Sequence, residues 1–384
     1  MTQPAVKARS GWFDEIVLLR GIAILSVLSL HAINQAGEHL RVMSPTLAFW
    51  ITVEAFTHGV MTFIAVSGFV LANKYGDNTD WLEFYRKRAM VIIPPYLFFS
   101  AVNVIGIRWG TEHPIDAAAI VKATLKGDSA AHMWFFVSII QLYFLFPVIY
   151  RVYVRFESRK RELRLLAWTF GAFVAWKVLA GVLAWAGPMD NHAFAKIMEL
   201  VPRRFFLNSL FYFLLGIYVR RNYEAVRAKV RAIPFAVLAA VLAGVGALTA
   251  FVDLAWTVDH AGINAHLWGL AARDSLKLLM NLLLIAAHFR LACHLAARRS
   301  VWTGWVTAFS RLSYGLYLIH VVMQVQIQRG LMAAGLSYGD FFLYPVLWAA
   351  NLSACYWSVL ALSKLPYSEW FLGVKKPAAN AAAA

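Results

Sequence analysis

The stretch LLRGIAILSVLSLH, residues 18–31, decides the fold of this chain. It is apolar except for two serines and the ionisable residues Arg20 and His31. Extended to residues 16–36, it is long enough to cross a hydrocarbon core of ~30 Å, which takes about 20 helical residues. Arg20 interrupts its start and no small-residue cleavage site follows His31, so it lacks the form of a signal peptide. We therefore expect an uncleaved first membrane span.

The composition of the whole chain is that of a membrane protein. Apolar and aromatic residues make up 61% of its 384 residues and charged residues 15%, whereas soluble domains hold about 45–50% and about 25%. The mean hydropathy is +0.61. These values exclude a disordered chain and argue against a water-soluble domain. The two cysteines, Cys293 and Cys355, lie in apolar segments without metal-like spacing, so we expect neither a disulfide framework nor a metal site.

Ten stretches are apolar and long enough to be spans: 16–36, 46–73, 89–109, 134–153, 165–186, 205–220, 233–253, 271–290, 306–328 and 340–363. We therefore predict an all-α, polytopic membrane protein, a bundle of about ten transmembrane helices. Residues 1–373 are expected to form a single integral-membrane domain, because no polar loop is long enough to hold a second one. The Ala-rich segment 374–384 is expected to be a disordered tail.

The positions of lysine and arginine predict the orientation. The chain carries 36 Lys and Arg against 20 Asp and Glu, a formal net charge of +16. If the N-terminus is cytoplasmic, 24 of the 36 basic residues fall on the cytoplasmic side, ten on the opposite side, and two, Lys177 and Arg311, within spans. Cytoplasmic loops are enriched in basic residues. We therefore expect both termini inside, and interpret the positive charge as topological rather than as a sign of nucleic-acid binding.

Arg20 and His31 are ionisable residues inside a span, where such residues are costly and usually face a cavity or a partner. They are eleven residues apart, which places them on one helical face with about 16 Å between them along the axis. The Arg would then lie at the cytoplasmic mouth and the His deep in the bundle. A snorkelling Arg and a packed polar His explain the same pattern equally well, so composition alone leaves both interpretations open.

Other polar residues fall at a similar depth, about 12–15 residues or 18–22 Å from the cytoplasmic end of their spans: His58, Gln141, Lys177 and His320. Their common depth predicts a cavity shared with His31, although a lone Lys177 could also pair with a carbonyl or snorkel. In the ninth span, Ser313, Tyr317 and His320 form one stripe at spacings of four and three. For Ser313 and Tyr317, interhelical hydrogen bonding explains the stripe as well as catalysis does.

A basic cluster follows the second expected span. Arg86, Lys87 and Arg88 precede the pair Pro94-Pro95 in WLEFYRKRAMVIIPPY, residues 81–96. Such a cluster at the inner membrane face can bind anionic lipid, fix the topology, or hold the phosphates of a nucleotide-bearing cofactor. The cluster by itself does not choose among these roles.

Together these segments resemble the acyltransferase-3 family of integral membrane acyltransferases over nearly the whole chain. LLRGIAILSVLSLH is similar to the family's first-span signature of Arg or Lys, ten residues and His, and MTFIAVSGFVLA to its second span with Ser-Gly-Phe. FYRKRAMVIIPPY, HMWFFVSIIQLYFLFPVI and LSYGLYLIH resemble its basic segment with a proline pair, its aromatic fourth span and its ninth span with Ser-Tyr-x-x-Tyr-Leu-x-His. Five motifs in the family's order on a ten-span frame make the resemblance specific.

Three positions depart from the family pattern. Val17 stands where an Asp is frequent, Val91 where a second Arg is expected, and Gln141 where some members carry a Glu. No carboxylate partner for His31 is therefore evident. Glu54, near the outer end of the second expected span, is the candidate substitute.

The resemblance implies acyl transfer, commonly of acetyl, from cytoplasmic acyl-coenzyme A to a hydroxyl of a cell-envelope polysaccharide or lipid-linked glycan at a bacterial inner membrane. Acyl-coenzyme A is then the donor substrate, and neither metal nor nucleic acid is expected. The implied catalytic residues are His31, His320 and Tyr317. The implied cofactor-binding residues are Arg20, Ser67, Arg86 and Arg88. His31 would act as general base or carry the acyl group itself.

Two other functions stay open: a glycan or lipid translocator with the same fold, and a structural subunit of an envelope polysaccharide machine. Acyl transfer needs His31 and acyl-coenzyme A, whereas export depends on cavity shape and tolerates the loss of a single base. The sequence names neither the acceptor, nor the acyl group, nor the oligomeric state.

Overall fold

The computed structural model describes residues 13–40, 42–76, 79–156, 158–186, 204–258, 267–298 and 300–372. Within these ranges the chain is α-helical and contains no strand. The helices are α1 (Asp14–Ile33), α2 (Gln35–His39), α3 (Pro45–Glu54), α4 (Val60–Lys74), α5 (Trp81–Arg108), α6 (Ala117–Lys126), α7 (Trp134–Val154), α8 (Arg159–Ala186), α10 (Leu207–Arg221), α11 (Tyr223–Ala232), α12 (Phe235–Val258), α13 (Leu267–Arg298), α14 (Val301–Ala333), α15 (Leu343–Leu362) and α16 (Ser368–Leu372). The first twelve residues and the expected tail, 374–384, lie outside the described residues.

Eight helical segments in the described part of the chain are long and apolar enough to cross a membrane. They are α1 continued by α2, and α5, α7, α8, α12, α13, α14 and α15. α4 and α10 are shorter, with 15 residues each. The predicted all-α, polytopic class is confirmed, while the second expected span contains the short helix α4 and the sixth corresponds to the short helix α10.

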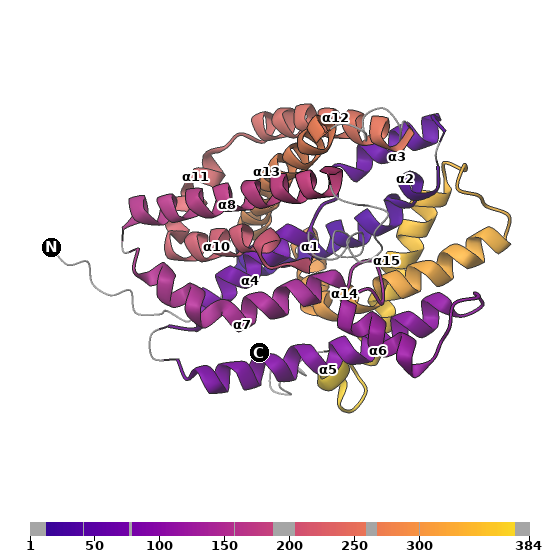
Figure 1. Ribbon diagram of the computed structural model, residues 1–384, viewed down its shortest axis with the longest axis horizontal. Helices are drawn as coiled ribbons and strands as arrows, with labels where there is room; N and C mark the ends of the chain where they lie inside the picture. The colour runs from indigo at the N-terminus through magenta and orange to yellow at the C-terminus, as the bar shows by residue number, and fades with distance from the viewer. Residues whose placement is uncertain are drawn as a thin grey trace.

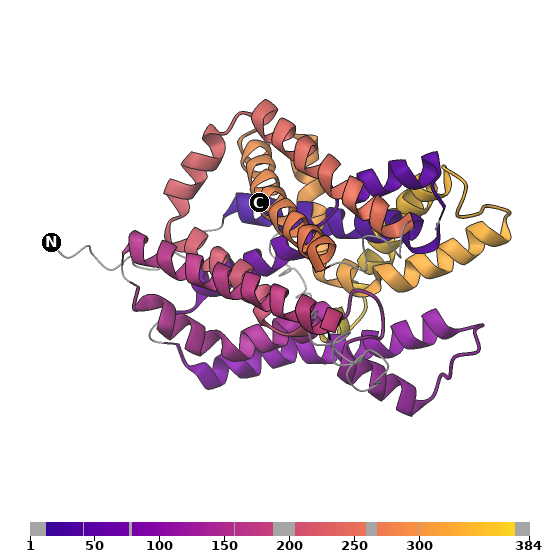
Figure 2. The ribbon, with the colours of Figure 1, turned by 45° about the horizontal axis from the view of Figure 1, so that its top comes forward.

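Most helices run along one common direction, with α1, α4 and α14 in the interior (Figure 1). α12 and α13 cover one side of the bundle, and α5 and α6 cover the other, which the turned view in Figure 2 also shows. The start of α5, the end of α7, the start of α8 and the whole of α11 lie at the left in Figure 1. We call this the basic end, because the loops that the charge distribution assigns to the cytoplasm meet there.

The second expected span, 46–73, is divided. α3 ends at Glu54 and α4 begins at Val60, and residues 55–59 between them are not helical. Gly59 in this break lies against the backbone of α1, where a Cβ would stand 2.5 Å from the Ala23 carbonyl oxygen. Any side chain would push the break away from α1. Apolar residues flank the break on both sides, which is why hydropathy predicts a continuous span.

α4 and α10 approach each other through two glycines. A Cβ at Gly68 of α4 would collide with the Phe213 carbonyl oxygen, and a Cβ at Gly216 of α10 would collide with the Ala65 carbonyl oxygen. Small residues let membrane helices bring their backbones close together. The short helix α10 is thereby held along α4, and the last turns of both helices end side by side at the basic end.

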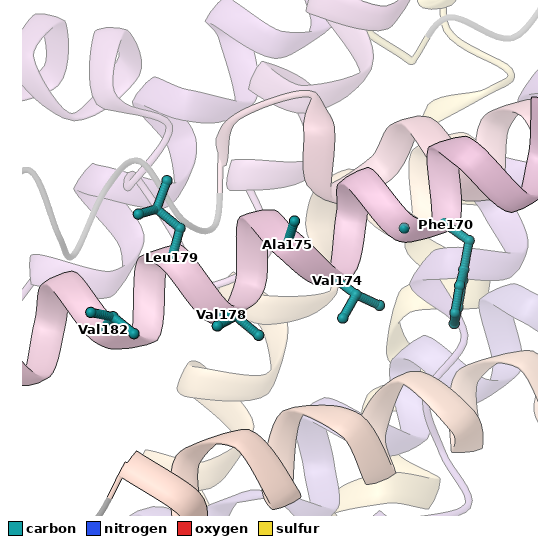
Figure 3. Close-up of a pocket in the computed structure, with 7 residues that line it drawn as sticks. Phe170, Val174, Ala175, Val178, Leu179 and Val182 are labelled. Atoms are coloured by element: carbon teal, nitrogen blue, oxygen red, sulfur yellow. The ribbon is translucent and has the colours of Figure 1, made fainter.

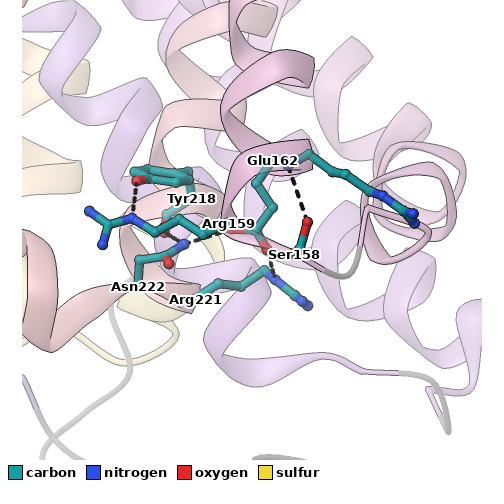
Figure 4. A network of polar contacts seen from close by, with 7 residues as sticks. Ser158, Arg159, Glu162, Tyr218, Arg221 and Asn222 are labelled. Carbon is teal, nitrogen blue, oxygen red and sulfur yellow. Dashed lines mark hydrogen bonds and ion pairs between the residues drawn. The ribbon is translucent and has the colours of Figure 1, made fainter. Parts of the chain in front are cut away.

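Carboxylates hold several basic residues in place at the basic end. Glu162 of α8 is 3% exposed and accepts a hydrogen bond from Arg221 Nε at 2.5 Å (Figure 4). Glu15 of α1 pairs with Arg227 of α11 at 2.8 Å and accepts from the Tyr223 hydroxyl at 2.9 Å. Burial raises the pKa of Tyr223, so its hydroxyl stays protonated and donates. These pairs tie α1, α8, α10 and α11 together.

α8 borders an open groove of about 620 Å³ lined by seven of its own residues between Phe170 and Val182 (Figure 3). None of the seven has a titratable or nucleophilic side chain. Most of the α8 span is also left uncovered by the rest of the protein. Such a lining suits lipid acyl chains and offers no group for chemistry.

Candidate active site

Three histidines from distant parts of the chain meet where α1, α14 and the turn before α7 come together. The ring centroid of His31 lies 4.9 Å from that of His320 and 6.2 Å from that of His132, and the last two are 4.5 Å apart. The ring of Tyr317 lies 5.2 Å from His132 and 5.6 Å from His320. We call these four residues the histidine cluster. It unites the three residues that the family resemblance implies as catalytic with a fourth, His132.

Hydrogen bonds to backbone carbonyls hold the cluster. The Tyr317 hydroxyl donates to the His132 carbonyl oxygen at 2.9 Å, and Gln324 Nε2 donates to the His31 carbonyl oxygen at 2.6 Å. His320 Nδ1 lies 2.9 Å from the Tyr317 carbonyl oxygen. A carbonyl can only accept, so this contact assigns the proton to Nδ1 and leaves Nε2 of His320 as the basic nitrogen.

The cluster contains buried nitrogens without partners. His320 is 0% and His132 1% exposed, while His31 is partly exposed. Within the described ranges, Nε2 of His320 has no hydrogen-bond partner, and neither ring nitrogen of His132 makes a hydrogen bond of ordinary geometry. Buried polar atoms in folded proteins nearly always have a partner. These nitrogens are therefore candidates for contact with a ligand.

His288 of α13 shows the opposite pattern. Its Nε2 lies 3.2 Å from Ser26 Oγ of α1, and its Nδ1 lies 3.2 Å from Thr62 Oγ1 of α4. Both ring nitrogens are thus used between helices. We assign His288 to packing, and the comparison sets the histidine cluster apart.

No carboxylate supports the cluster in the described part of the chain, where no ion pair involves one of its histidines. Glu54, the candidate partner of His31, lies next to Gly37, and its electrostatic neighbours include Lys277 and Asp253. Among the described residues, no three His, Cys, Asp or Glu side chains are grouped as metal ligands would be.

His132 is a residue that the hydropathy pattern does not single out. It stands two residues before α7, in a turn, so a search for ionisable residues inside spans passes over it. The sequence feature that could have identified His132 is its position at the start of HMWFFVSIIQLYFLFPVI, the stretch that resembles the family's fourth span.

At the basic end, two guanidinium groups flank the end of α4 and contact neutral partners. Arg88 of α5 donates from Nη2 to the Tyr75 hydroxyl at 2.8 Å, and its guanidinium carbon lies 5.5 Å from the Tyr75 ring centroid. Arg220 of α10 donates from Nε to Asn73 Oδ1 at 2.6 Å. Neither pairs with a carboxylate of the described chain, so both keep a positive charge available for an anion. Arg220 is a second residue absent from the sequence-based candidates.

The other expected cofactor-binding residues are distributed around this pair. Arg20 Nε of α1 donates to Ser310 Oγ of α14 at 3.2 Å. Ser67 lies close to the side chain of Tyr143, and Tyr143 in turn lies close to Arg88. Arg86 is exposed at the surface of α5. The structure thus connects Ser67 with Arg88 and leaves Arg86 outside this group of contacts.

The expected cavity of polar residues at one depth is not formed. Gln141 instead binds backbone atoms at the start of α10, through hydrogen bonds of 2.8 and 3.2 Å. Lys177 lies over an aromatic ring of its own helix at 5.9 Å, and the electrostatic neighbours of His58 are Lys277 and Asp253. Of these residues only His320 joins His31. Depth fixes the height of a residue in the membrane but not the direction in which its side chain points.

A row of polar side chains leads from the cluster toward the end of the bundle opposite the basic end. Gln324 and Gln328 follow His320 along α14 at successive turns, 3% and 9% exposed. Gln328 Nε2 donates to the Tyr338 hydroxyl at 2.6 Å, and the Tyr338 ring stacks on exposed His39 with centroids 3.8 Å apart. Two buried amides therefore connect the cluster with a stacked pair of rings near the surface.

Comparison with known proteins finds a family that matches nearly the whole chain. A family model described as an acyltransferase domain, of the acyltransferase-3 type, matches residues 12–363. A curated protein of Bacillus subtilis (strain 168), named "Putative membrane-bound acyltransferase YfiQ", is 25% identical over 318 residues, which cover 81% of each chain. No solved structure matches the chain.

Proposed function

The chain belongs to the acyltransferase-3 family of membrane acyltransferases, and from this premise we propose that it transfers an acyl group, first of all acetyl, from cytoplasmic acyl-coenzyme A to a hydroxyl of a cell-envelope polysaccharide or lipid-linked glycan. The observation that carries the proposal is that Arg20 and His31 both face α14. They stand about 16 Å apart along α1. This separation suits a donor with charged phosphates at one end and a thioester at the other.

The basic end supports an acyl-coenzyme A donor. Arg20, Arg88 and Arg220 contact hydroxyl and amide groups rather than carboxylates in the described chain. Guanidinium groups form strong, often bidentate contacts with phosphate. We assign these three residues to the phosphates of the donor, and the thioester to the histidine cluster.

The histidine cluster supports general-base catalysis. His31 is the partly exposed member of the three histidines, so it is the one that a substrate reaches. Its imidazole takes the proton of the acceptor hydroxyl while the hydroxyl oxygen attacks the thioester carbon. The coenzyme A thiolate then leaves and recovers the proton from the imidazolium. His320, whose Nε2 is free to accept, and Tyr317, which holds the His132 backbone, position the rings.

The row of amides supports an acceptor that approaches from the end opposite the donor. Gln324 and Gln328 lead away from His320, and the stacked rings of Tyr338 and His39 lie where the row ends. Amides and aromatic rings are groups that bind sugar hydroxyls and sugar faces. Mass spectrometry of envelope glycans, in bacterial cells with and without the protein, should reveal an ester mass that depends on it.

The central experiment uses the His31→Ala variant. A positioned general base contributes about 10²–10⁴-fold, so transfer from labelled acetyl-coenzyme A by the purified protein should fall by this factor. Coenzyme A binding should persist, because the guanidinium groups lie about three helical turns away. His113→Ala, a change in an exposed loop, serves as the matched control. Transfer by His31→Ala within a few-fold of the parent would overturn the proposal and favour a translocator.

A further inference from the structure

Asn103 of α5 is a buried amide without a partner. It is 0% exposed, and neither Nδ2 nor Oδ1 has a hydrogen-bond partner among the described residues. An unpaired buried amide is expensive, so its presence requires an explanation such as contact with a ligand. No role follows for Asn103 from the family resemblance or from the proposed function.

The register of α5 against α14 gives the height of Asn103 in the bundle. A Cβ at Gly106 would collide with the Val322 side chain, and Gln326 Nε2 donates to the Gly106 carbonyl oxygen at 2.6 Å. α5 and α14 both run away from the basic end (Figure 1). Asn103 lies about 4.5 Å nearer that end than Gly106, and His320 about 3 Å nearer than Val322. Asn103 and His320 are therefore at almost the same height.

The direction of Asn103 follows from Tyr96, which lies seven residues earlier and about 20° away around α5. The Tyr96 hydroxyl donates to the Thr124 carbonyl oxygen at 2.5 Å, so this face of α5 is turned toward the segment 124–133. That segment carries His132. Asn103 thus lies on the face between α14 and the segment that supplies the third histidine.

Several unpaired polar groups belong to the same region. Ser129 Oγ, Nε2 of His320 and both atoms of the Asn103 amide are buried without hydrogen-bond partners in the described chain, and neither ring nitrogen of His132 makes a hydrogen bond of ordinary geometry. One such group could be an accident of packing. Their coincidence on three elements that pack together, α5, the turn before α7 and α14, indicates a polar site beside the histidine cluster that a substrate group completes.

We propose that Asn103 is a further catalytic residue, whose Nδ2 donates a hydrogen bond to the carbonyl oxygen of the acyl group during transfer. The acceptor oxygen bonds to the carbonyl carbon as His31 takes its proton, and the carbonyl π electrons move to the oxygen, which becomes an oxyanion. The C–S bond then breaks, the carbonyl re-forms, and the coenzyme A sulfur takes the proton from His31. The products are the ester and free coenzyme A.

An amide suits this position for two physical reasons. Its donor is strongest where charge develops in a water-excluded site. It also carries no net charge, so it avoids the desolvation penalty that an unpaired Lys or Arg would carry at 0% exposure. This inference rests on the proposed acyl transfer and adds a group that acts on the acyl carbonyl rather than on the proton.

The test compares Asn103→Leu, close to the amide in shape, and Asn103→Ala with the parent and with Asn351→Leu. Asn351 of α15 is 1% exposed and its Nδ2 is also unpaired, so it controls for loss of a buried amide. Each variant is assayed for kcat and KM with labelled acetyl-coenzyme A and envelope glycan from the parent strain, for binding of coenzyme A itself, and for thermal unfolding.

If Asn103 is catalytic, its replacement should lower the activity of the protein without lowering its stability. Removing one oxyanion donor typically costs about 10²–10³-fold in kcat, while the melting temperature of Asn103→Leu should stay or rise and coenzyme A affinity should hold. Asn351→Leu should keep the parent kcat. Parent-like kcat in Asn103→Leu, or a fall in kcat that follows a fall in melting temperature in both variants, would overturn the inference. A parent enzyme whose transfer does not depend on His31 would instead overturn the proposed function.

Discussion

Tyr317 illustrates how one residue can hold two neighbouring histidines through hydrogen bonds. Its OH donates to the His132 carbonyl oxygen at 2.9 Å, and its own carbonyl accepts from His320 Nδ1. The same residue thus fixes the position of one imidazole and the tautomer of another. Phenylalanine has a ring of the same size but no hydroxyl. Tyr317→Phe therefore removes only the hydrogen bond to the His132 carbonyl oxygen.

We expect Tyr317→Phe to lower kcat by about 10–100-fold, because small misplacements of reacting groups have large effects on rate. Loss of one hydrogen bond should cost about 0.5–1.5 kcal/mol of stability. Steady-state kinetics with acetyl-coenzyme A should show an unchanged KM, because the site proposed for the donor phosphates lies at the basic end, away from Tyr317. A variant with parent kcat would show that His132 needs no such anchor.

Arg220 and Arg221 are neighbours in sequence with different partners, and they form a matched pair. Arg220→Gln should weaken coenzyme A binding by about 10–100-fold, since a hydrogen bond to a charged group is worth about 1.5–3 kcal/mol. Arg221→Gln should instead lower the melting temperature, because it leaves the buried carboxylate of Glu162 without its cation. Calorimetric titration with coenzyme A and thermal unfolding would separate the two. Equal affinities in both variants would remove Arg220 from the donor site.

The residues that sequence reasoning found and missed differ in the kind of signal they carry. Arg20 and His31 stand out because ionisable residues in a span are rare, and their spacing predicts a common face. Arg220 does not stand out among many basic residues at span ends; what distinguishes it is the neutral partner Asn73, a contact between α4 and α10. His132 lies in a turn, and its meeting with His31 and His320 depends on packing across distant segments.

At the scale of helices, the crossing of α4 and α10 brings Arg220, one of the residues proposed to bind the donor phosphates, against Asn73. Gly68→Ala should destabilise the protein by about 1–3 kcal/mol or more, because the new methyl group meets the Phe213 backbone and neither helix can retreat without opening the core. Gly171→Ala on α8 is the control, since a Cβ there meets nothing within 4 Å. Thermal unfolding in detergent should show a lower melting temperature for Gly68→Ala alone. Equal melting temperatures would mean that the helices separate at little cost.

The helices that were predictable from the sequence are those whose position follows from hydropathy alone. Long apolar stretches such as α5 and α14 stand where hydropathy predicts spans. The division of 46–73 into α3 and α4 was not predictable, because residues 55–59 are set by the contact of Gly59 with α1 rather than by local composition. Likewise Gln141 satisfies the backbone at the start of α10, a requirement that exists only once α7 and α10 have packed.

At the scale of the whole molecule, the bundle separates two kinds of chemistry along its length. The guanidinium groups that we propose for the donor phosphates lie at the basic end, where Glu15 and Glu162 neutralise other cations. The amide row and the stacked rings of Tyr338 and His39 lie beyond the histidine cluster, toward the opposite end. An enzyme arranged in this way can take its donor from one side of a membrane and its acceptor from the other.

The last prediction follows from this polarity: positions 87 and 112 should face opposite sides of the membrane. Lys87→Cys is in the basic segment, and Glu112→Cys is in the loop after α5; both residues are exposed. The native Cys293 and Cys355 are buried, so they should give little background. The excess of basic residues at the basic end predicts that this end is cytoplasmic. An impermeant maleimide added to intact cells should therefore label position 112 and spare position 87 until the membrane is opened. Labelling of position 87 from outside would show that the basic end faces outward. The residues proposed to bind the donor phosphates would then lie on the wrong side for cytoplasmic acyl-coenzyme A, and the donor would have to be a different molecule.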